Sequence, residues 1–415
     1  MKKSDSIGTE MFEFVKKNAS ADPRALLLSL HGKETGFPAA LAVTQIECRR
    51  KCSRKLAAFT AHERFLFPTT QAAEQATHQC VASYHAGLVG TGRRVADITA
   101  GLGIDAFTVA AAGNEVRAFE LAPERASALR HNAEVLGAAN VSVTEGDSLE
   151  ALRDDATRYD VIFVDPARRD AADRRTFLFR DCLPDIVSNL ALLRSHADRI
   201  MVKASPILDT ERMTAELPGI SEIHLVCVKG ECKEVLGIIG GGGGSDKIAV
   251  TVVDLRDNAD ATAEPVSVWR TTLGETGNAG APVASESDIR PGAYIYDPNA
   301  GIHKLGCGRA LCSRFAGLRR ISANTDLYVS DSLIEDFPGR VFRVGDVIGG
   351  KDTRWLKGER REVMARNYVM SADSLRRRLK VVSGGDMTII GCRAGVRATP
   401  LLLDCEKIIG ATVVF

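Results

Sequence analysis

The stretch that decides the fold reads Val95-Ala96-Asp97-Ile98-Thr99-Ala100-Gly101-Leu102-Gly103-Ile104-Asp105. An apolar run of strand type ends in a turn that contains glycines, and a helical pattern opens directly after it. Such a turn brings the backbone close to a ligand at the carboxyl edge of a parallel sheet. We therefore expect a buried strand, a tight turn through Gly101 and Gly103, and a nucleotide-like ligand at this edge.

Strand and helix patterns alternate after this turn. Alternation of this kind predicts an α/β fold with a parallel sheet and right-handed crossovers. A late strand is expected at 247–255, and the run of glycines at 240–244 before it predicts a flexible loop or a wide hairpin connection. The other expected strands are at 95–98, 115–119, 141–143, 161–164, 200–202 and 223–228, and the clearest helical patterns cover 123–136 and 183–193.

The rest of the 415-residue chain divides into a helical start and small C-terminal segments. Helical patterns punctuated by prolines fill residues 10–89. The polar stretch 257–291 lacks strong periodicity and is expected to hold a domain boundary. The predicted parts are a helical N-terminal region over 1–90, the sheet domain over 91–285, and two small α+β domains over 286–340 and 341–415.

Composition excludes several classes of protein. Hydrophobic residues make up 45% and charged residues 26%, which excludes a disordered or fibrous chain. The formal net charge of +1 gives no whole-molecule attraction to nucleic acid or membrane. No apolar run approaches the ~18 residues of a membrane span, and the first residues lack the apolar core of a secretory signal. We expect a cytoplasmic protein without membrane contact.

The ten cysteines of a chain without a secretory signal predict reduced thiols rather than a disulfide framework. Two pairs come close to metal-ligand spacing: Cys48 with Cys52, and Cys307 with Cys312 near His303. Neither pair has the Cys-x-x-Cys gap of common zinc sites, and no second pair follows nearby. Buried free thiols are the favoured interpretation, so no metal site is expected.

Acidic side chains around the glycine turn distinguish between two ligands. Gly101 and Gly103, with Glu120 at about the ~20-residue spacing of a ribose ligand, also satisfy the loose dinucleotide fingerprint of an NAD enzyme. Asp97 and Asp105 flank the turn, however, where a dinucleotide would place a pyrophosphate that prefers N–H groups. S-adenosylmethionine instead carries an ammonium and a sulfonium, which carboxylates stabilise. The acids therefore favour S-adenosylmethionine.

Two further acids follow successive expected strands. Glu120 ends the second strand and is placed to accept both ribose hydroxyls, and Asp147 with Ser148 follows the third, near the adenine edge. A helix cap or a solvated turn is the alternative for each acid taken singly. Their occurrence at consecutive strand ends favours the cofactor interpretation.

The fourth strand delivers Asp165 to the same sheet edge, and Pro166 fixes the backbone so that nearby carbonyls can point into the site. Methyl transfer is an in-line displacement at carbon, so the protein aligns the nucleophile and handles its proton. We expect Asp165 to contact the nucleophile, with Pro166 and Arg168 beside it and Arg169 on the substrate. The alternative is that Asp165 caps a turn and the arginines pair with surface acids.

Two motifs together resemble a known family. Asp97-x-Thr99-Ala100-Gly101-Leu102-Gly103-x-Asp105 and Asp165-Pro166-Ala167-Arg168-Arg169 are similar to class I S-adenosylmethionine-dependent methyltransferases, specifically the bacterial group with a C-terminal THUMP-like domain. Four more stretches resemble this group: Lys203-Ala204-Ser205-Pro206-Ile207-Leu208-Asp209, Val228-Lys229-Gly230-Glu231-Cys232-Lys233-Glu234, Tyr296-Asp297-Pro298-Asn299-Ala300 and Phe337-Pro338-Gly339-Arg340-Val341-Phe342.

The resemblance implies a Rossmann-like, seven-stranded class I methyltransferase sheet with S-adenosylmethionine as cofactor. It also implies a small ferredoxin-like domain before the THUMP-like region and, by analogy with THUMP proteins, an RNA substrate. Ala167 and Arg168 depart from the Asp/Asn-Pro-Pro-aromatic pattern of amino-methylating members, which leaves the methylated atom open. The expected cofactor-binding residues are Gln75, Thr77, Asp97, Thr99, Gly101, Gly103, Asp105, Glu120, Asp147 and Ser148.

Three of the expected contacts have local alternatives. The segment Glu74-Gln75-Ala76-Thr77 resembles one that closes over the methionine end of the cofactor, and an ordinary helix start is the alternative. Lys203 and Glu231 lie at predicted strand ends and are expected to contact substrate, and a surface salt bridge is the alternative.

The C-terminal segment is locally basic. Residues 341–415 hold fourteen Lys and Arg against eight Asp and Glu, which on a neutral chain indicates a polyanion-binding face. The densest cluster is Arg376, Arg377, Arg378 and Lys380, for which a solvated helix face is the alternative. The sequence thus predicts a methyltransferase acting on a base in tRNA or rRNA. Its rivals are a methyltransferase for a protein or small molecule, an NAD-dependent oxidoreductase, and a non-catalytic RNA-binding protein with a vestigial fold.

Overall fold

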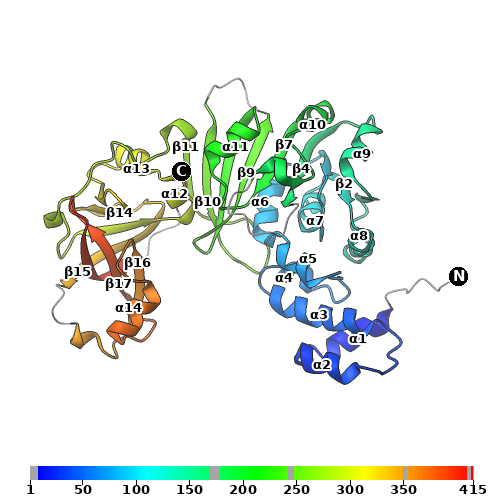
Figure 1. The fold of residues 1–415 in the computed structure, drawn as a ribbon, viewed down its shortest axis with the longest axis horizontal. Helices are drawn as coiled ribbons and strands as arrows, with labels where there is room; N and C mark the ends of the chain where they lie inside the picture. The colour runs from blue at the N-terminus through cyan, green and yellow to red at the C-terminus, as the bar shows by residue number, and fades with distance from the viewer. Residues whose placement is uncertain (1–7, 169–177, 242–246, 349–352, 409–412, 415) are drawn as a thin grey trace. The chain divides into compact units, whose positions relative to one another are not determined.

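The computed structural model describes residues 8–168, 178–241, 247–348, 353–408 and 413–414 (Figure 1). The chain divides into two compact units. The first unit holds Met1–Ile223, Glu234–Gly244 and Leu255–Glu264, and the second holds His224–Lys233, Ser245–Asp254 and Pro265–Phe415.

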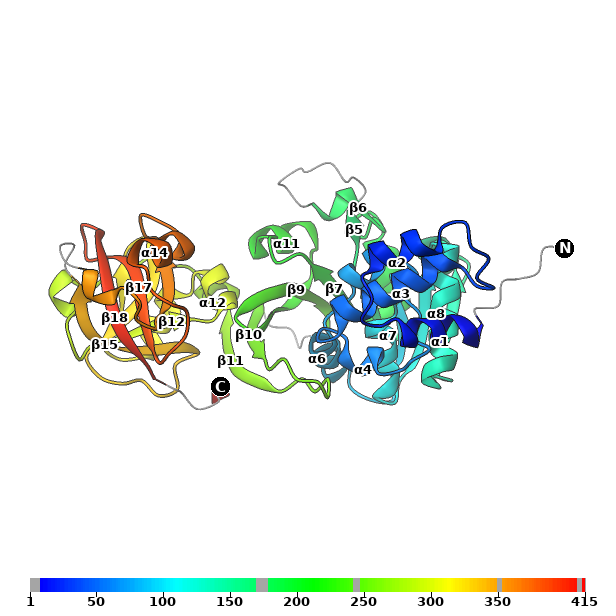
Figure 2. The same cartoon turned by 90° about the horizontal axis from the view of Figure 1, so that it is seen from below.

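The first unit begins with helices, as the sequence pattern indicates. Helices α1, α2 and α3 lie side by side (Figures 1 and 2). Met11, Phe12 and Val15 of α1 are buried against Ala42 and Ile46 of α3, because apolar residues recur at helical spacing on the facing sides. The helices are α1 (Thr9–Lys17), α2 (Pro23–Leu30), α3 (Ala39–Cys52), α4 (Ala57–Thr60), α5 (Thr70–Gln75) and α6 (Gln79–Val89).

A ten-stranded sheet follows, in the order β19-β11-β10-β8-β9-β7-β4-β1-β2-β3. The strands β1, β2, β3, β4 and β7 pair in parallel, and β9 runs antiparallel to β7. The seven strands from β3 to β8 form the expected Rossmann-like sheet, which β10, β11 and β19 extend. Their bounds are β1 (Arg94–Asp97), β2 (Glu115–Glu120), β3 (Val141–Glu145), β4 (Tyr159–Val164), β7 (Ala197–Ala204), β8 (Ile220–Val228), β9 (Glu231–Gly240), β10 (Ala249–Leu255), β11 (Pro265–Thr272) and β19 (Val413–Val414).

Helices connect the parallel strands. The strand β4 is buried on both faces at Val161, Ile162 and Phe163, which explains why it reads as a continuous apolar run. Its residues join a core with Val95 and Phe107. The connecting elements are α7 (Ile104–Ala111), α8 (Pro123–Leu136), α9 (Ser148–Arg153), α10 (Leu190–His196) and α11 (Thr210–Glu216), with a small antiparallel pair β5 (Ala167–Arg168) and β6 (Cys182–Leu183).

The helix expected over 183–193 is wrong in its first half. Leu183 pairs with Ala167 in a strand, and α10 begins only at Leu190. Asp185 explains the late start, because its side chain accepts from Ser188 N at 3.1 Å and its carbonyl accepts from the Asn189 side chain at 2.8 Å. Such local bonds compete with the helical ladder.

The polar stretch 257–291 contains a strand that the sequence pattern did not reveal. Residues Pro265–Thr272 form β11, in which Trp269 is 2% exposed and packs against Phe315 with ring centroids 6.2 Å apart. Burial against a distant segment therefore overrides the weak local signal. Of the glycine run at 240–244, Gly240 ends β9, and the positions from 242 lie outside the described residues.

The second unit holds a seven-stranded sheet in the order β13-β14-β12-β15-β18-β17-β16. The boundary expected at residue 340 falls inside β15, so strands from both small C-terminal segments share one sheet. The strands are β12 (Tyr294–Pro298), β13 (Arg319–Ser322), β14 (Thr325–Ser330), β15 (Gly339–Ile348), β16 (Glu362–Arg366), β17 (Met387–Ala394) and β18 (Thr399–Ile408), and the helices are α12 (Ala300–Leu305), α13 (Gly308–Arg314) and α14 (Ala372–Leu379).

No helix in the described ranges combines the length and the apolar character that crossing a membrane requires.

Candidate active site

The glycine turn after β1 has the backbone conformation that the sequence predicts. Gly101 and Gly103 have φ of 55° and 85°, a region that L side chains rarely adopt. A Cβ on Gly103 would lie 2.3 Å from Leu129 Cδ1, so this glycine allows α7 and α8 to pack closely. A Cβ on Gly101 would meet nothing nearer than Thr99 O at 3.9 Å. The backbone at Gly101 is therefore open to a ligand.

Asp97 ends β1 as a buried carboxyl group, 3% exposed. Its Oδ1 accepts from Thr99 N at 3.1 Å. Burial and the neighbouring Asp105 carboxylate together raise the pKa of Asp97 to about 8. A cationic ligand beside this group would offset both effects, so the chemistry of Asp97 fits the ammonium or sulfonium of S-adenosylmethionine.

Glu120 ends β2 and fixes the turn. Its carboxylate accepts from Gly101 N at 3.0 Å and from Ala122 N at 2.8 Å, and it pairs with Arg125 at 2.7 Å. The side chain is thus held at the strand end where a ribose diol would need an acceptor. Asp97, Glu120 and the open backbone at Gly101 together fit the cofactor that the sequence predicts.

Asp147 and Ser148 begin α9 after β3. Asp147 accepts from Leu149 N at 2.8 Å and from Glu150 N at 3.1 Å, which is the helix-capping alternative for this acid. Ser148 is buried in the first turn. Capping fixes the Asp147 side chain in place, and its contact with adenine stays a prediction.

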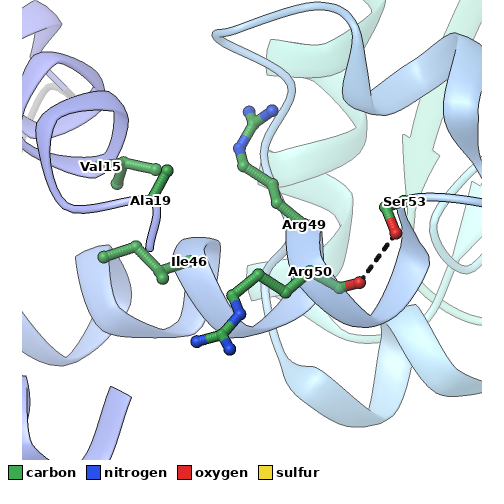
Figure 3. Close-up of a pocket in the computed structure, with 6 residues that line it drawn as sticks. All are labelled: Val15, Ala19, Ile46, Arg49, Arg50 and Ser53. Carbon is green, nitrogen blue, oxygen red and sulfur yellow. Dashed lines mark hydrogen bonds between the residues drawn. The ribbon is translucent and has the colours of Figure 1, made fainter. Parts of the chain in front are cut away.

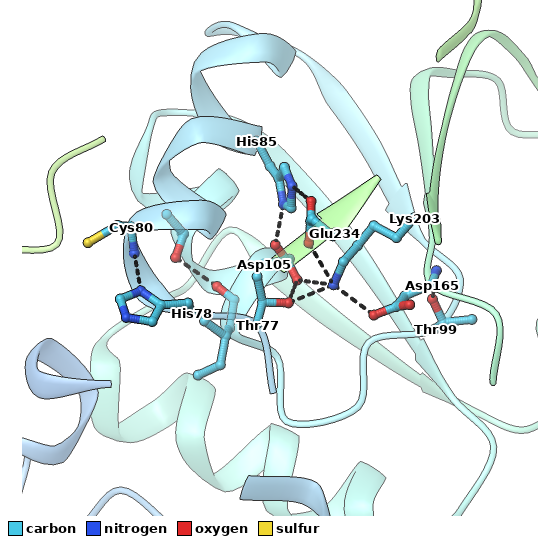
Figure 4. A network of polar contacts seen from close by, with 11 residues as sticks. Thr77, His78, Cys80, His85, Thr99, Asp105, Asp165, Lys203 and Glu234 are labelled. Carbon is cyan, nitrogen blue, oxygen red and sulfur yellow. Dashed lines mark hydrogen bonds and ion pairs between the residues drawn. The ribbon is translucent and has the colours of Figure 1, made fainter. Parts of the chain in front are cut away.

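Lys203 is the centre of a buried network at the carboxyl ends of β1, β4 and β7 (Figure 4). Its ammonium lies 2.7 Å from Asp165 Oδ2 and 2.8 Å from Thr77 Oγ1, and the carboxylates of Asp105 and Glu234 lie 3.6 and 3.8 Å away. Burial opposes the charge on Lys203, but these acids outweigh it and raise its pKa. Lys203 is 6% exposed, so a surface salt bridge is the wrong interpretation for it.

His85, from α6, joins the same network and was missed by the sequence analysis. Its Nδ1 lies 2.7 Å from Asp105 Oδ1 and its Nε2 lies 2.5 Å from Glu234 Oε1 (Figure 4). Burial lowers the pKa of His85, but Glu234 and Asp105 outweigh it and raise the pKa to about 9. A single histidine inside an apolar helix gives no sequence signal, because only the fold brings Asp105 and Glu234 to its two nitrogens.

Asp105 therefore has a different environment from the one expected. The sequence interpretation places its carboxylate beside a cationic cofactor. In the structure it pairs with His85 and Lys203 and accepts from the Thr77 hydroxyl. Burial opposes ionisation, but Lys203 and His85 hold the pKa of Asp105 below its usual range. Its negative charge is thus already compensated within the protein.

Asp165 follows β4 and is exposed, with 46% of its side chain accessible. Its backbone N donates to Thr99 Oγ1 at 2.7 Å, which links the end of β4 to the turn after β1. Pro166 behind it is buried. Arg168 is described only through its backbone, which pairs with Cys182, and Arg169 lies outside the described residues.

Other expected site residues make contacts that do not belong to this network. Gln75 is exposed at the end of α5, whereas Thr77 two residues later is buried in the network. Glu231 is an exposed side chain that pairs with Lys233 at 2.6 Å, so the surface salt bridge is what the structure shows for it. Arg377, Arg378 and Lys380 are exposed at the end of α14, and Arg376 there is partly buried and pairs with Asp373 at 3.2 Å. A substrate contact by this cluster stays a prediction.

Metal-ligating side chains come together at one place in the described part of the chain. His78, Cys80 and Asp257 offer ligand atoms within 4.8 Å of one another. His78 Nδ1 accepts from Cys80 N at 3.3 Å, and His78 Nε2 lies 3.4 Å from Asp257 Oδ1. The cysteine pairs singled out from spacing take no part in this group, and all ten cysteines are free thiols.

A pocket of about 440 Å³ lies between α1 and α3 (Figure 3). Its walls come from α1, α3 and the turns that follow them, and they contain none of the residues expected at the cofactor. The pocket is therefore separate from the strand-end site. Its lining residues are Val15, Ala19, Ile46, Arg49, Arg50 and Ser53.

Comparison with known proteins finds similarity to methyltransferases and to a ferredoxin-like domain. Residues 61–174 match the family model described as "Putative SAM-dependent methyltransferase", and residues 294–338 match a ferredoxin-like domain. The chain is similar to the solved structure of a "putative methyltransferase" from Porphyromonas gingivalis W83, with 26% identity, a TM-score of 0.80, and coverage of 96% of this chain and 98% of that one. None of these descriptions names a THUMP-like region, which stays a prediction.

Two further solved structures overlap only in part and carry no inference. One is the type I restriction-modification methyltransferase subunit from Streptococcus thermophilus, with 14% identity, a TM-score of 0.32, and coverage of 61% of this chain and 69% of that one. The other is a "putative rRNA-methylase" from Clostridium thermocellum, with 14% identity, a TM-score of 0.30, and coverage of 39% and 94%. No curated protein matches the chain. The glycine turn, the acids around it and the first set of matches identify the protein as an S-adenosylmethionine-dependent methyltransferase that also carries a ferredoxin-like domain.

Proposed function

We propose that this methyltransferase acts on a nucleotide in structured RNA, tRNA or rRNA, with Asp165 in contact with the acceptor atom. The observation that carries the proposal is the position of Asp165. It is an exposed carboxylate at the end of β4, and a buried ammonium fixes one of its oxygens. Asp97, Glu120 and Gly101 would hold the cofactor at the neighbouring strand ends. S-adenosylmethionine, when bound, supplies a methyl group on a sulfonium.

Asp165 would orient the acceptor. Oδ2 is held by Lys203, while Oδ1 has no hydrogen-bond partner among the described residues. Oδ1 can therefore accept a hydrogen bond from an N–H or O–H of the acceptor and hold its lone pair toward the methyl group. General acid–base assistance of this kind contributes typically ~10²–10⁴-fold to a rate.

Lys203 would act through Asp165 as a positioning residue. Its ammonium fixes the carboxylate at 2.7 Å, and Thr77, Asp105 and Glu234 fix the ammonium in turn. A rigid, hydrogen-bonded support of this kind keeps a reacting group in its productive geometry.

The local charge of the C-terminal part supports an RNA substrate. Residues 341–415 carry fourteen basic and eight acidic side chains on a chain whose overall charge is +1. Three of the four basic residues singled out at the end of α14 are exposed. A basic surface on a neutral protein favours a polyanionic substrate over a small molecule or a neutral peptide.

The test is transfer of radiolabelled methyl groups from S-adenosylmethionine to an extract of cells that lack this protein. Parallel samples are digested with ribonuclease and with protease, and the Asp165→Asn variant gives the background. We expect label that ribonuclease releases and protease does not. Label released only by protease, or label in the low-molecular-weight fraction, would identify a protein or small-molecule substrate and overturn the RNA assignment.

A further inference from the structure

Asp297 is the centre of a second buried charge cluster, located in the second unit. It is the one acid of the stretch Tyr296-Asp297-Pro298-Asn299-Ala300 and is 1% exposed. Arg340 and Arg366 both bind its carboxylate, and His303 Nε2 lies 2.8 Å from Oδ1. Burial opposes ionisation, but His303 and the two arginines hold the pKa of Asp297 below its usual range. The carboxylate is therefore ionised.

The backbone brings Arg340 to this acid. Asp297 and Arg340 are cross-strand partners on β12 and β15. A Cβ on Gly339 would lie 2.3 Å from Asp297 O, so the glycine of the stretch Phe337-Pro338-Gly339-Arg340 is required for the close approach of the two strands. Both C-terminal stretches singled out from the sequence thus meet at one point, and the proposed function assigns no role to either.

Arg366 reaches Asp297 because the sheet folds back on itself. Three strands separate β16 from β12 in the hydrogen-bonding order. Arg366 nevertheless binds both Asp297 oxygens, with Nε to Oδ1 at 3.0 Å and Nη2 to Oδ2 at 3.1 Å. The same closure brings Gly395 N to Ile321 O at 2.8 Å. The curved sheet therefore places an arginine from the neighbouring strand and an arginine from a distant strand on a single carboxylate.

The cluster has more positive charge than its acid can neutralise. Asp297 carries one negative charge, whereas Arg340 and Arg366 carry two positive charges, and Asp297 is the acid that they contact within the described ranges. Both guanidiniums use Nε and Nη2 on Asp297, and the Nη1 groups have no hydrogen-bond partner among described residues. The arginine side chains are 51% and 38% exposed. Their remaining donors therefore reach solvent.

We propose that Arg340 and Arg366, held in place by Asp297, form a phosphate-binding site in the second unit. Planar guanidiniums match the geometry of phosphate oxygens, and fixing them on a buried acid removes the rotamer freedom that binding would otherwise have to restrict. The phosphate belongs to a phosphodiester of the RNA substrate. This identification of the ligand rests on the proposed function, whereas the binding site itself does not.

The test measures binding of the full chain to a short mixed-sequence single-stranded RNA by filter binding at several salt concentrations, and to inorganic phosphate by calorimetry. Arg340→Gln is the test variant, because this side chain is the more exposed of the two. Arg270→Gln is the matched control, since Arg270 is an exposed arginine of the same unit and lies outside the basic segment 341–415. S-adenosylmethionine affinity and the thermal midpoint report whether each variant is folded.

We expect Arg340→Gln to weaken RNA binding about tenfold and to reduce the salt slope by roughly 0.7, with the control near wild type. The RNA affinity of Arg340→Lys should lie between those of wild type and Arg340→Gln, because lysine keeps the positive charge but lacks the paired N–H donors of the guanidinium. A different result is that the wild-type protein binds inorganic phosphate but no RNA, with phosphate binding abolished in Arg340→Gln. That result would support the site and reject RNA as the source of the phosphate. Equal losses in Arg340→Gln and Arg270→Gln, unchanged RNA binding in Arg340→Gln, or wild-type binding of neither probe would overturn the site.

Discussion

The ammonium of Lys203 lies 2.7 Å from the carboxylate of Asp165, and the two residues differ sharply in exposure. The Lys203 side chain is 7% exposed, whereas that of Asp165 is 46% exposed. The pair therefore joins a buried network of charges to a carboxylate that a substrate can reach. Lys203 binds one oxygen of the Asp165 carboxylate from the buried side and leaves the solvent-exposed side of the carboxylate accessible.

Replacing Lys203 removes the one ammonium shared by three carboxylates. We expect Lys203→Met to lower the free energy of unfolding by ~3–5 kcal/mol, because the Asp105 and Glu234 side chains lose a buried partner. Urea denaturation checks this. Lys233→Met is the control, since Lys233 makes a surface pair with Glu231 and its removal should change stability by less than about 1 kcal/mol. Equal effects of the two substitutions would contradict the central position of Lys203.

Asp165→Asn should lower methyl transfer far more than it weakens cofactor binding. The carboxylate is proposed to accept a hydrogen bond from the acceptor, so the single-turnover rate should fall by ~10²–10⁴-fold. Asp160→Asn is the matched control, because Asp160 lies on β4, the strand that Asp165 follows, and pairs with Arg93 on the surface. A variant as fast as wild type would leave Asp165 with a structural role.

Asp97 should couple cofactor binding to a proton. Its pKa is raised to about 8 in the free protein, so it is protonated at neutral pH and should ionise beside a cationic ligand. Affinity for S-adenosylmethionine should therefore rise as pH increases toward 8, with release of a proton that calorimetry in buffers of different ionisation enthalpy detects. NAD should not bind.

Asp97→Asn should weaken cofactor binding and abolish that pH dependence. Asp154→Asn, at an exposed acid beyond α9, should leave both unchanged. If the affinity of Asp97→Asn depended on pH as that of wild type does, the released proton would come from another group. That result would contradict the placement of the cofactor beside Asp97.

His85 should make the protein less stable at alkaline pH. Its pKa is about 9 in the folded state and ~6.5 when unfolded, so the folded protein binds the extra proton. The contribution of His85 is fully present below pH ~6.5 and is lost as pH rises through about 9, with a total on the order of 3 kcal/mol. Denaturation at several pH values between 6 and 10 should show a smaller decline in the free energy of unfolding for His85→Gln than for wild type. His31→Gln, at an exposed histidine, should follow wild type.

The basic end of α14 is a separate prediction about RNA. Neutralising Arg376, Arg377, Arg378 and Lys380 together should weaken RNA binding and reduce its salt slope by roughly 0.7 for each phosphate of a single strand that the protein no longer neutralises. Base preference should barely change, because phosphate contacts position a substrate and base contacts specify it. Filter binding measures both quantities. An unaltered slope would identify the cluster as a solvated helix face.

Local sequence determined the elements that build the sheet edge where the cofactor is expected. The apolar run before Asp97, the positive-φ glycines after it and the apolar strand before Asp165 each carry their signal within a few residues, so their positions could be read directly. The helix over Pro123–Leu136 was predicted to the residue for the same reason, since Pro at its first position and Gly137 at its end mark the boundaries. Periodicity and turn chemistry are local properties.

Tertiary structure alone decided which of those groups meet. Asp105 reads as a ligand of a cationic cofactor in the sequence, but the fold places His85 and Lys203 against it, from segments 20 and roughly 100 residues away. The strand containing Trp269 and the convergence of Arg340 and Arg366 on Asp297 likewise depend on distant partners. Charge pairing and burial act through space, so neither the partners of a buried acid nor its pKa follow from the residues beside it in the chain.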